Sequence, residues 1–431
     1  MRIQWLTALL LLCVTSIASG QLTIEITQGN DSPTPIAIVP FSGAENEALS
    51  VDIPAVIGAD LYRSGVFSII DKKDMLSLPD KSGDVFYRDW RAIGSEYVLV
   101  GRLEKILGPR SIQLEYELMD VQSQQVILTG TLTGQSSKLR DLAHAVADDV
   151  YEKVSGIAGA FATKVIYVSA VHDNGKNFSY RLMLSDADGF GEKIIFESKE
   201  PIMSPSWSPD GKQVAYVSFE TRKAAIYIQT FATGRRERLT DFPGINGAPA
   251  WSPDGTKMAM VLSKGNNPDI YIMDLLTKQL TRLASHFAID TEPAWSSDGK
   301  AVIFTSDRGG KPQIYKVTLK DNWVERLTFE GDYNARARML PDDRGMIMIH
   351  GRNGGYHVAL QMFDTGRIYS LSKTSLDESP TIAPNGAMLM YATQYGKKGI
   401  LAAVSIDGSV KYRLPSTSSD VREPAWSPFL D

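Results

Sequence analysis

The sequence has 431 residues, a single cysteine and a formal net charge of −5 at neutral pH. This length exceeds one ordinary domain, so we expect two domains. The acidic balance is mild and no block of basic residues accompanies it, which argues against nucleic acid as a partner.

Residues 1–20 are predicted to be an export signal peptide. A positive charge and an apolar run lead to Ala18-Ser19-Gly20, whose small residues suit a cleavage site. The run is too short to span a bilayer and no second one follows, so we expect no transmembrane segment in the mature form. A lipoprotein signal ending at Cys13 fits less well, because Leu12 precedes this cysteine inside the apolar run. Cleavage removes the only cysteine, which excludes disulfides and thiolate catalysis.

The mature chain begins with a predicted β-strand, Gln21-Leu22-Thr23-Ile24-Glu25-Ile26-Thr27, in which polar and apolar side chains alternate. The segment Gln28–Pro33 separates this strand from the domain that follows. A short strand behind a flexible hinge can pair with a free sheet edge of another protein. We therefore predict a detachable recognition strand. The alternative is an edge strand that stays docked in the N-terminal domain.

Residues 21–159 are predicted to form an α/β domain. Its expected strands are Pro35–Phe41, Tyr97–Gly101 and Ile112–Met119, and its expected helices are Val51–Arg63 and Ser137–Ser155. Both helices carry an apolar stripe on one face, which should pack against the sheet. A glycine-rich stretch at residues 156–160 is the expected linker.

Residues 160–431 contain an internal repeat of about 44 residues. Trp207, Trp251 and Trp295 are 44 residues apart, each in a Pro-x-Trp-Ser-x-Asp-Gly motif, and Met339, Ile382 and Trp426 continue the series. Three further short strands follow each copy, and four strands per repeat predict a propeller blade. The tryptophans are interpreted as packing between neighbouring blades.

The two ends of the repeat region are each incomplete. The last copy stops just after Trp426, whereas Val165–Ser169, Tyr180–Asp186 and Lys193–Glu197 supply three strands without a tryptophan strand before them. Together they make one blade, so the C-terminal strand should close the ring and leave no open edge. The predicted fold is an α/β N-terminal domain followed by an all-β six-bladed β-propeller closed by the C-terminal strand.

Motifs for catalysis or metal binding are missing from the sequence. There is no nucleophile elbow and no phosphate-binding glycine loop, and the five histidines show no metal-ligand spacing. His350 and His357 are expected on two strands of one hairpin. A peptidase would need a further domain of about 200 residues, and no segment remains to form it. We therefore expect no catalytic residue, no metal, no cofactor and no enzyme activity.

Several segments resemble the TolB family, a periplasmic component of the Tol-Pal system of Gram-negative bacteria. They are Pro35–Phe41, Asn246–Pro249, Thr291–Pro293 and Pro424–Pro428, in addition to the order of domains. The resemblance covers essentially the whole chain. It implies a periplasmic scaffold that binds the lipoprotein Pal through the propeller and TolA through the N-terminal segment. It also implies roles in outer-membrane integrity and in invagination during cell division, and we expect a monomer. The alternative function is a periplasmic small-ligand-binding propeller that uses the central channel.

Residues just before each tryptophan strand enter the innermost strand of a blade, so they should ring one opening of the channel. These residues are Ser204, Ala248, Glu292, Arg336, Ser379 and Glu423. The predicted Pal-binding residues are Asn246, Ala248 and Thr291 by resemblance, with Glu292, Arg336, Glu378, Arg422 and Glu423 from the ring and its neighbours. The predicted TolA-binding residues are Gln21, Leu22, Thr23, Ile24, Glu25 and Ile26. The alternative is that ring residues only cap strands.

Overall fold

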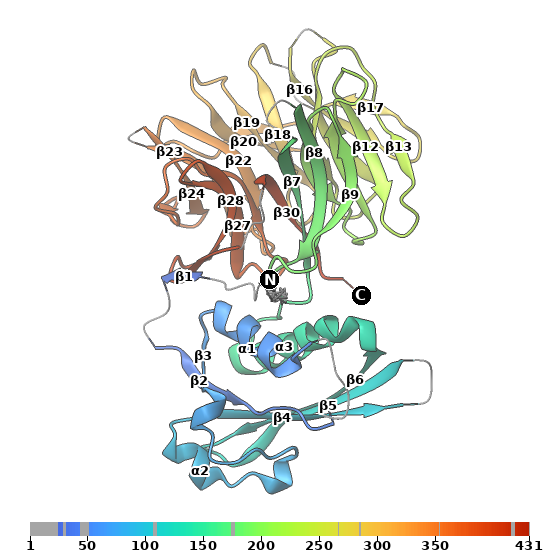
Figure 1. The fold of residues 1–431 in the computed structure, drawn as a ribbon. Helices are drawn as coiled ribbons and strands as arrows, with labels where there is room; N and C mark the ends of the chain where they lie inside the picture. The colour runs from blue at the N-terminus through green and yellow to red at the C-terminus, as the bar shows by residue number, and fades with distance from the viewer. Residues whose placement is uncertain are drawn as a thin grey trace, which may run out of the picture.

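The structure is a computed structural model that describes residues 25–28, 32–43, 51–106, 110–173, 177–265, 267–283, 286–352, 354–414 and 419–430. The predicted signal peptide and four predicted TolA-binding residues, Gln21 to Ile24, lie outside this set. A mixed α/β domain lies below a propeller in Figure 1. No helix in the described part of the chain is long and apolar enough to cross a membrane.

The N-terminal domain is built on a five-stranded sheet of order β3-β2-β4-β5-β6. Its strands are β2 (Thr34–Ile38), β3 (Phe67–Ile69), β4 (Tyr97–Lys105), β5 (Ser111–Asp120) and β6 (Gln125–Gln135). Its helices are α1 (Ile53–Arg63), α2 (Tyr87–Ala92) and α3 (Leu139–Ser155). Strand β2 is parallel to β3 and β4, whereas β4, β5 and β6 are antiparallel. Helices α1 and α3 lie between the sheet and the propeller (Figure 1), and α2 covers the opposite face.

Both predicted long helices form, each two residues shorter at its start than expected. Helix α1 begins after Asp52, whose side chain accepts a hydrogen bond from the backbone N–H of Ala55 at 3.1 Å. It is followed by Gly65 with φ of +73°, and α3 ends at Gly156 with φ of +74°, a conformation that favours glycine. The apolar stripes face the sheet and form the core of this domain, as predicted.

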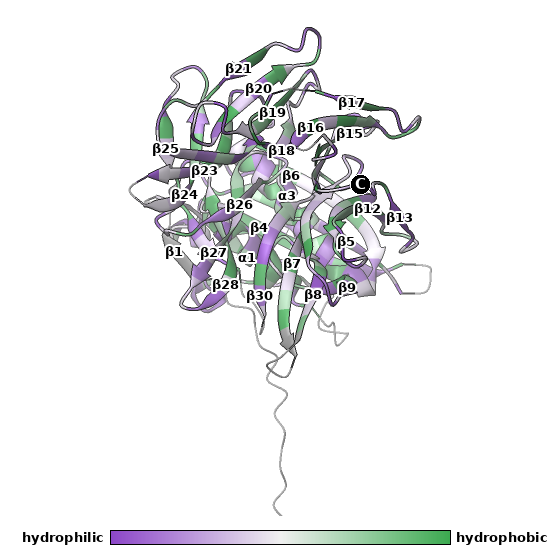
Figure 2. Cartoon of the chain, turned by 90° about the horizontal axis from the view of Figure 1, so that it is seen from above, coloured by the Kyte–Doolittle hydropathy of each residue, from purple (hydrophilic) through white to green (hydrophobic). Residues whose placement is uncertain are grey.

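The propeller consists of six blades, and in each the strands pair antiparallel from the channel outward. Blade one is β30 (Asp420–Trp426), β7 (Lys164–Asp173), β8 (Asn177–Asp186) and β9 (Lys193–Ser198); blade two is β10 (Ile202–Trp207), β11 (Gln213–Ser218), β12 (Ala225–Thr230) and β13 (Arg236–Arg238); blade three is β14 (Asn246–Trp251), β15 (Lys257–Leu262), β16 (Asp269–Asp274) and β17 (Leu280–Arg282). Blade four is β18 (Asp290–Trp295), β19 (Ala301–Ser306), β20 (Gln313–Thr318) and β21 (Val324–Arg326); blade five is β22 (Tyr333–Met339), β23 (Gly345–Arg352), β24 (Gly355–Met362) and β25 (Ile368–Ser370); blade six is β26 (Glu378–Ile382), β27 (Met388–Tyr395), β28 (Lys398–Ser405) and β29 (Lys411–Arg413). Seen from above, the blades surround a common centre (Figure 2).

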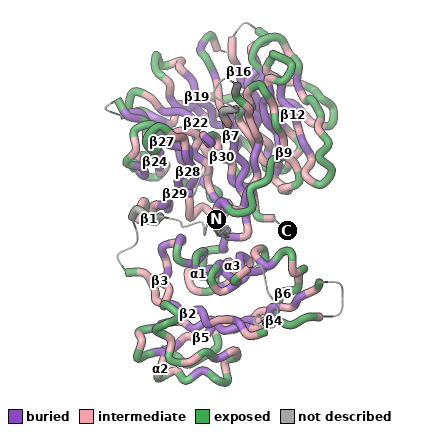
Figure 3. Tube along the Cα trace, viewed as in Figure 1, coloured by how far each residue is buried: buried purple, intermediate pink, exposed green. Residues whose placement is uncertain are grey.

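The C-terminal strand closes the ring, as the sequence predicts. Strand β30 pairs with β7, so that Val421 lies opposite Ser169 and Trp426 opposite Val165. Blade one is therefore assembled from both ends of the propeller region. Figure 3 shows buried segments in the middle of the propeller and exposed segments in the outer loops.

The repeated tryptophans join neighbouring blades. The indole Nε1 of Trp251 donates to the carbonyl oxygen of Ser206 at 3.2 Å, and that of Trp295 donates to Ala250 at 2.9 Å. Each bond runs from one blade to the preceding one, which agrees with the predicted packing role. Trp207 continues the series across the closure, because its Nε1 donates to the carbonyl of Ala425 at 2.9 Å.

The N-terminal strand lies on the propeller. Strand β1 (Glu25–Gln28) pairs antiparallel with β29 and adds a fifth strand at the outer edge of blade six. Its register places Glu25 opposite Arg413 and Ile26 opposite Tyr412. The alternative of an edge strand docked in the N-terminal domain is therefore wrong for the described residues of this segment.

A buried group of charges joins the N-terminal domain to blade one. His144 on α3 is fully buried; its Nδ1 lies 2.5 Å from a carboxylate oxygen of Asp60 on α1, and its Nε2 lies 3.6 Å from Asp186 on β8. Lys164 on β7 pairs with the same Asp186 at 2.7 Å. Burial alone would lower the pKa of His144, but Asp60 and Asp186 outweigh burial and raise it to about 9. The imidazole is therefore held as a cation between two domains.

Candidate binding surface at the channel mouth

Each innermost strand contains a β-bulge at its centre, where the pairing with the next strand shifts register. In every blade the bulge places one residue in the left-handed region: Ser204 (φ 51°), Ala248 (46°), Glu292 (54°), Arg336 (56°), Ser379 (53°) and Glu423 (52°). None is glycine, although this region favours glycine. All six line the channel. We call these six residues the bulge ring.

Polar contacts connect the bulge ring from blade to blade. The Arg336 Nε lies 2.6 Å from a carboxylate oxygen of Glu292, and its Nη1 donates to the Ser379 hydroxyl. The backbone N–H of Ser204 donates to the Glu423 carboxylate. Burial lowers the pKa of Arg336, but Glu292 and other nearby carboxylates outweigh burial and raise it. Burial also raises the pKa of Glu423, against the opposing effect of Arg336. The ring is thus an ordered set of charges across several blades.

The other predicted Pal contacts divide into buried and surface residues. Asn246 is only 1% exposed, and its side-chain amide donates to the carbonyl oxygen of Phe242 at 2.7 Å. It therefore holds the loop that precedes β14. Thr291 is half-buried beside Glu292. Arg422 is exposed, and its Nε lies 4.0 Å from the carboxylate of Glu378.

A second set of residues at the mouth was not predicted. Three residues before the bulge ring, four blades carry a large aliphatic or aromatic side chain: Ile245, Ile289, Tyr333 and Leu376. Exposed fractions of 46%, 49% and 51% for Ile245, Ile289 and Leu376 show that they reach solvent. We call these four residues the apolar rim. Aligning the repeats on the ring would have revealed them, because the offset is the same in each blade.

A cavity of about 330 Å³ lies where the apolar rim meets the bulge ring. The rings of Tyr333 and Tyr356 form one wall, edge to face with centroids 5.0 Å apart. Arg336, Glu378 and Arg422 also line this cavity. Three of the predicted Pal-binding residues thus share one hollow with two aromatic side chains that the sequence did not single out.

One group among the described side chains has a spacing that could hold a metal ion. The ligand atoms of His144, Asp186 and Asp188 lie within 4.8 Å of one another. Cations of the protein already contact these carboxylates, since the Nε of Arg140 lies 3.4 Å from Asp186 and an Nη of Arg63 lies 3.5 Å from Asp188. A divalent ion would have to displace these contacts, so we assign the group to the junction between domains.

The fold and this mouth define a class: a two-domain protein whose closed propeller carries a charged ring and an apolar rim at one end of its channel. Residues 22–127 match the family model described as the TolB amino-terminal domain, and residues 151–430 match the TolB beta propeller domain. The chain therefore belongs to the TolB family of Tol-Pal system proteins.

Individual relatives agree over nearly the full length. The chain is 53% identical over 410 residues to the Tol-Pal system protein TolB of Pseudomonas aeruginosa. These 410 residues are 95% of this chain and 94% of that protein. It is 51% identical over 425 residues to that of Pseudomonas putida, with 98% of each chain covered. The crystal structure of TolB from Acinetobacter baumannii superposes with a TM-score of 0.87 at 41% identity, covering 95% of this chain and all of that one.

Proposed function

We propose that this protein is a non-enzymatic periplasmic scaffold of the Tol-Pal system, acting in outer-membrane integrity and in invagination during cell division. In this proposal the channel mouth binds the lipoprotein Pal. The observation that supports this proposal most directly is that the bulge ring and the apolar rim lie together at one end of the channel. The opposite end faces the N-terminal domain, where the Asn385 side chain donates to the carbonyl of Ala158 at 2.8 Å (Figure 1). The mouth is therefore on the free face of the propeller.

The composition of the mouth favours a protein partner. Protein interfaces combine apolar side chains, which a partner buries, with polar groups that form hydrogen bonds, and a few of these residues supply most of the binding energy. The ion pair between Arg336 and Glu292 remains partly accessible, with side-chain exposures of 29% and 23%. Such pairs contribute more to the choice of partner than to affinity. We expect the apolar rim to supply affinity and the bulge ring to supply specificity.

A double substitution tests this site. Glu292→Arg reverses one ring charge beside Arg336, and Ala248→Trp adds bulk to the neighbouring blade. Together they should weaken Pal binding at least about tenfold, because every 1.4 kcal/mol lost changes Kd tenfold. Calorimetric titration with purified Pal measures the affinity.

A matched control makes the same exchanges away from the mouth. Glu237→Arg with Ala232→Trp places them on the exposed outer part of blade two. The control should bind Pal like the wild type. Unchanged affinity in a folded Glu292→Arg, Ala248→Trp protein would move the Pal site elsewhere on the molecule.

We further propose that Gln21–Ile26 binds TolA by adding a strand to an edge of that protein. The placement of β1 on the outer edge of blade six supports this, because the segment can already pair as a strand. Removing residues 21–30 should abolish TolA binding and spare Pal binding.

A pair of substitutions separates the two faces of this strand. Ile24→Lys with Ile26→Lys changes its apolar face and should abolish TolA binding, whereas Thr23→Lys with Thr27→Lys changes the other face and should have a smaller effect. TolA binding that survives the deletion would refute the proposal.

We also propose cleavage after Gly20, which would give a mature chain with an N-terminal domain up to residue 159 and a propeller from residue 160. Sequencing the N-terminus of the protein isolated from the periplasm tests the cleavage point. A mature protein that begins elsewhere, or that keeps Cys13, would contradict it.

A further inference from the structure

The fourth copy of the repeat, which forms the innermost strand of blade five, departs from the others at three consecutive residues, Ala337-Arg338-Met339. The other copies have Pro, then a small residue, then Trp or Ile at these positions. The small residues are Ser206, Ala250, Ala294, Thr381 and Ala425. Arg338 is therefore the one charged side chain among six equivalent positions, and all six line the channel.

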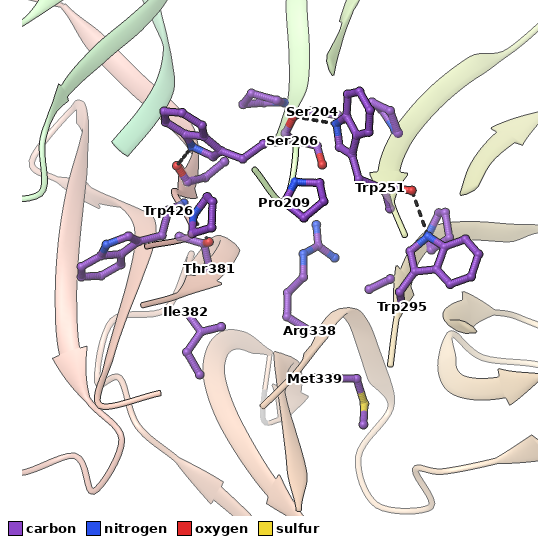
Figure 4. Close-up of a pocket in the computed structure, with 18 of the residues that line it drawn as sticks. Ser204, Ser206, Pro209, Trp251, Trp295, Arg338, Met339, Thr381, Ile382 and Trp426 are labelled. Atoms are coloured by element: carbon purple, nitrogen blue, oxygen red, sulfur yellow. Dashed lines mark hydrogen bonds between the residues drawn. The ribbon is translucent and has the colours of Figure 1, made fainter. Parts of the chain in front are cut away.

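Arg338 projects into a cavity of about 390 Å³ that runs along the channel. Figure 4 shows its guanidinium directed to the middle of this pocket, between walls of proline, tryptophan and small residues. Its Nη1 donates to the carbonyl of the adjacent Ala337 at 2.9 Å. No carboxylate of the described residues lies within 4 Å of it, in contrast to Arg336, which pairs with Glu292 at 2.6 Å.

The positive charge of Arg338 is poorly compensated. Desolvation lowers its pKa, Arg336 acts in the same direction, and Glu292 and Glu423 oppose them only in part. A guanidinium does not lose its proton in proteins, so this group stays charged whatever its surroundings. Its planar fork of N–H donors matches two oxygens of a carboxylate or phosphate. The cavity has room for such an ion with several waters, since each water takes about 30 Å³.

We propose that the channel holds a small oxyanion, a carboxylate or phosphate group, bound by the guanidinium of Arg338. The site lies inside the channel and does not depend on the proposed docking of a protein at the mouth. The ion is a free solute in this proposal, and a carboxylate side chain carried in by a docked protein is the rival source.

The test uses the full mature chain with inorganic phosphate and, separately, acetate as probes. Ionic strength is held constant with chloride. Because a ligand that binds only the folded state raises Tm, both probes should raise the Tm of the wild type. Arg338→Met should weaken phosphate binding at least tenfold, and Arg338→Lys should weaken it less, because lysine keeps the charge and loses the fork.

Two controls keep the proposal falsifiable. Arg367→Met removes an exposed arginine from the outer part of the same blade and should leave phosphate binding unchanged. Arg338→Ala restores the residue of three other copies, so it should fold normally and still lose the effect of phosphate. Equal shifts of Tm by phosphate in the wild type, in Arg338→Met and in Arg338→Ala would overturn the site. A second outcome would also overturn it: phosphate does not raise the Tm of the wild type, and Arg338→Met loses affinity for Pal. In that case the group that binds Arg338 is a carboxylate side chain of the docked protein.

Discussion

Both ends of the described chain add a strand to the propeller, one beside the channel and one at the outer edge. Strand β30 completes blade one beside the channel, and β1 extends blade six at its outer edge. Both use antiparallel backbone pairing, yet their surroundings differ. Trp426 of β30 donates from its indole Nε1 to the Thr163 hydroxyl at 2.7 Å and from its backbone N–H to Thr381 at 3.0 Å. It thus binds blades one and six together, whereas β1 contacts a three-residue edge strand.

The energies of the two attachments differ accordingly. A hydrogen bond contributes about 0.5–1.5 kcal/mol net, and ordering the backbone of one residue costs about 1–2 kcal/mol. For the four residues of β1 these terms nearly cancel, so this strand can leave its edge at small cost. Strand β30 adds the burial of Val421 and Trp426 in the core shared by blades one and six. We therefore expect the pairing to be permanent at the channel and exchangeable at the outer edge.

The largest expected effect comes from removing the strand at the channel. Deleting residues 421–431 exposes the inner edge of β7 and unpairs blade one, so we expect aggregation or loss of the cooperative thermal transition. Scanning calorimetry measures this. Deleting only residues 429–431 is the control, because it spares β30. A 421–431 deletion that melts at the wild-type temperature would show that the ring does not need closure.

A smaller effect should follow from removing only the side chain that locks β30. Trp426→Ala should lower the free energy of unfolding by about 3–5 kcal/mol, because it opens a cavity between blades. Urea titration followed by circular dichroism gives the value. Trp323→Ala serves as the control, since Trp323 is 66% exposed and should cost little. Equal losses in both variants would mean that Trp426 does not join the blades.

Replacing His144, at the junction between the two domains, should have an intermediate effect on the free energy of unfolding. The size of this effect should depend on pH. The pKa of His144 is raised from 6.5 to about 9, so its stabilising contribution is fully present below about pH 6.5 and is lost as the pH rises through 9. His144→Gln should lower the free energy of unfolding by roughly 1–3 kcal/mol at low pH. The variant should also lose less of its unfolding free energy than the wild type as the pH rises from about 6.5 to about 9.

Urea titrations at several pH values measure this dependence. His286→Gln changes a half-buried histidine of the propeller and should keep the wild-type profile. The same decline with pH in the wild type and in His144→Gln would show that His144 does not bind its proton more tightly in the folded state.

The smallest effect is expected at the outer edge. Deleting residues 21–30 removes β1, and the near-cancellation of its energies predicts a change of less than about 1 kcal/mol in unfolding free energy. Thermal melts of the mature and shortened chains measure it. If the N-terminal domain unfolds in the shortened chain, β1 is required for the fold, as β30 is, and the expected difference between the two strands is wrong.

The propeller could be predicted because its signal is repeated. Six copies at near-constant spacing specify the blades, and the incomplete copies at both ends specify the closure. The N-terminal domain carries no such redundancy. Its edge strand β6 is rich in threonine and glycine, and the short helix α2 buries only Trp90 of its six residues, so neither gives a clear apolar period. Short and irregular elements are fixed by packing that sequence periodicity does not record.

The mouth of the channel was predictable in position but not in detail. A constant offset from the repeat motif placed the bulge ring. The burial of Asn246 was not predictable, because an amide can serve its own loop or a partner equally well. The partner of β1 is also invisible in sequence, since Ile26 and Tyr412 lie at opposite ends of the chain. Contacts between residues so far apart depend on how the finished domains meet.

Backbone shape at the bulge ring does not depend on the side chain present. Serine, alanine, glutamate and arginine all adopt φ between 46° and 56° there. Each blade therefore offers one position whose chemistry can change while its architecture stays fixed. A single replacement at one of these positions should therefore change the charge or size of the channel mouth and leave the path of the backbone unchanged.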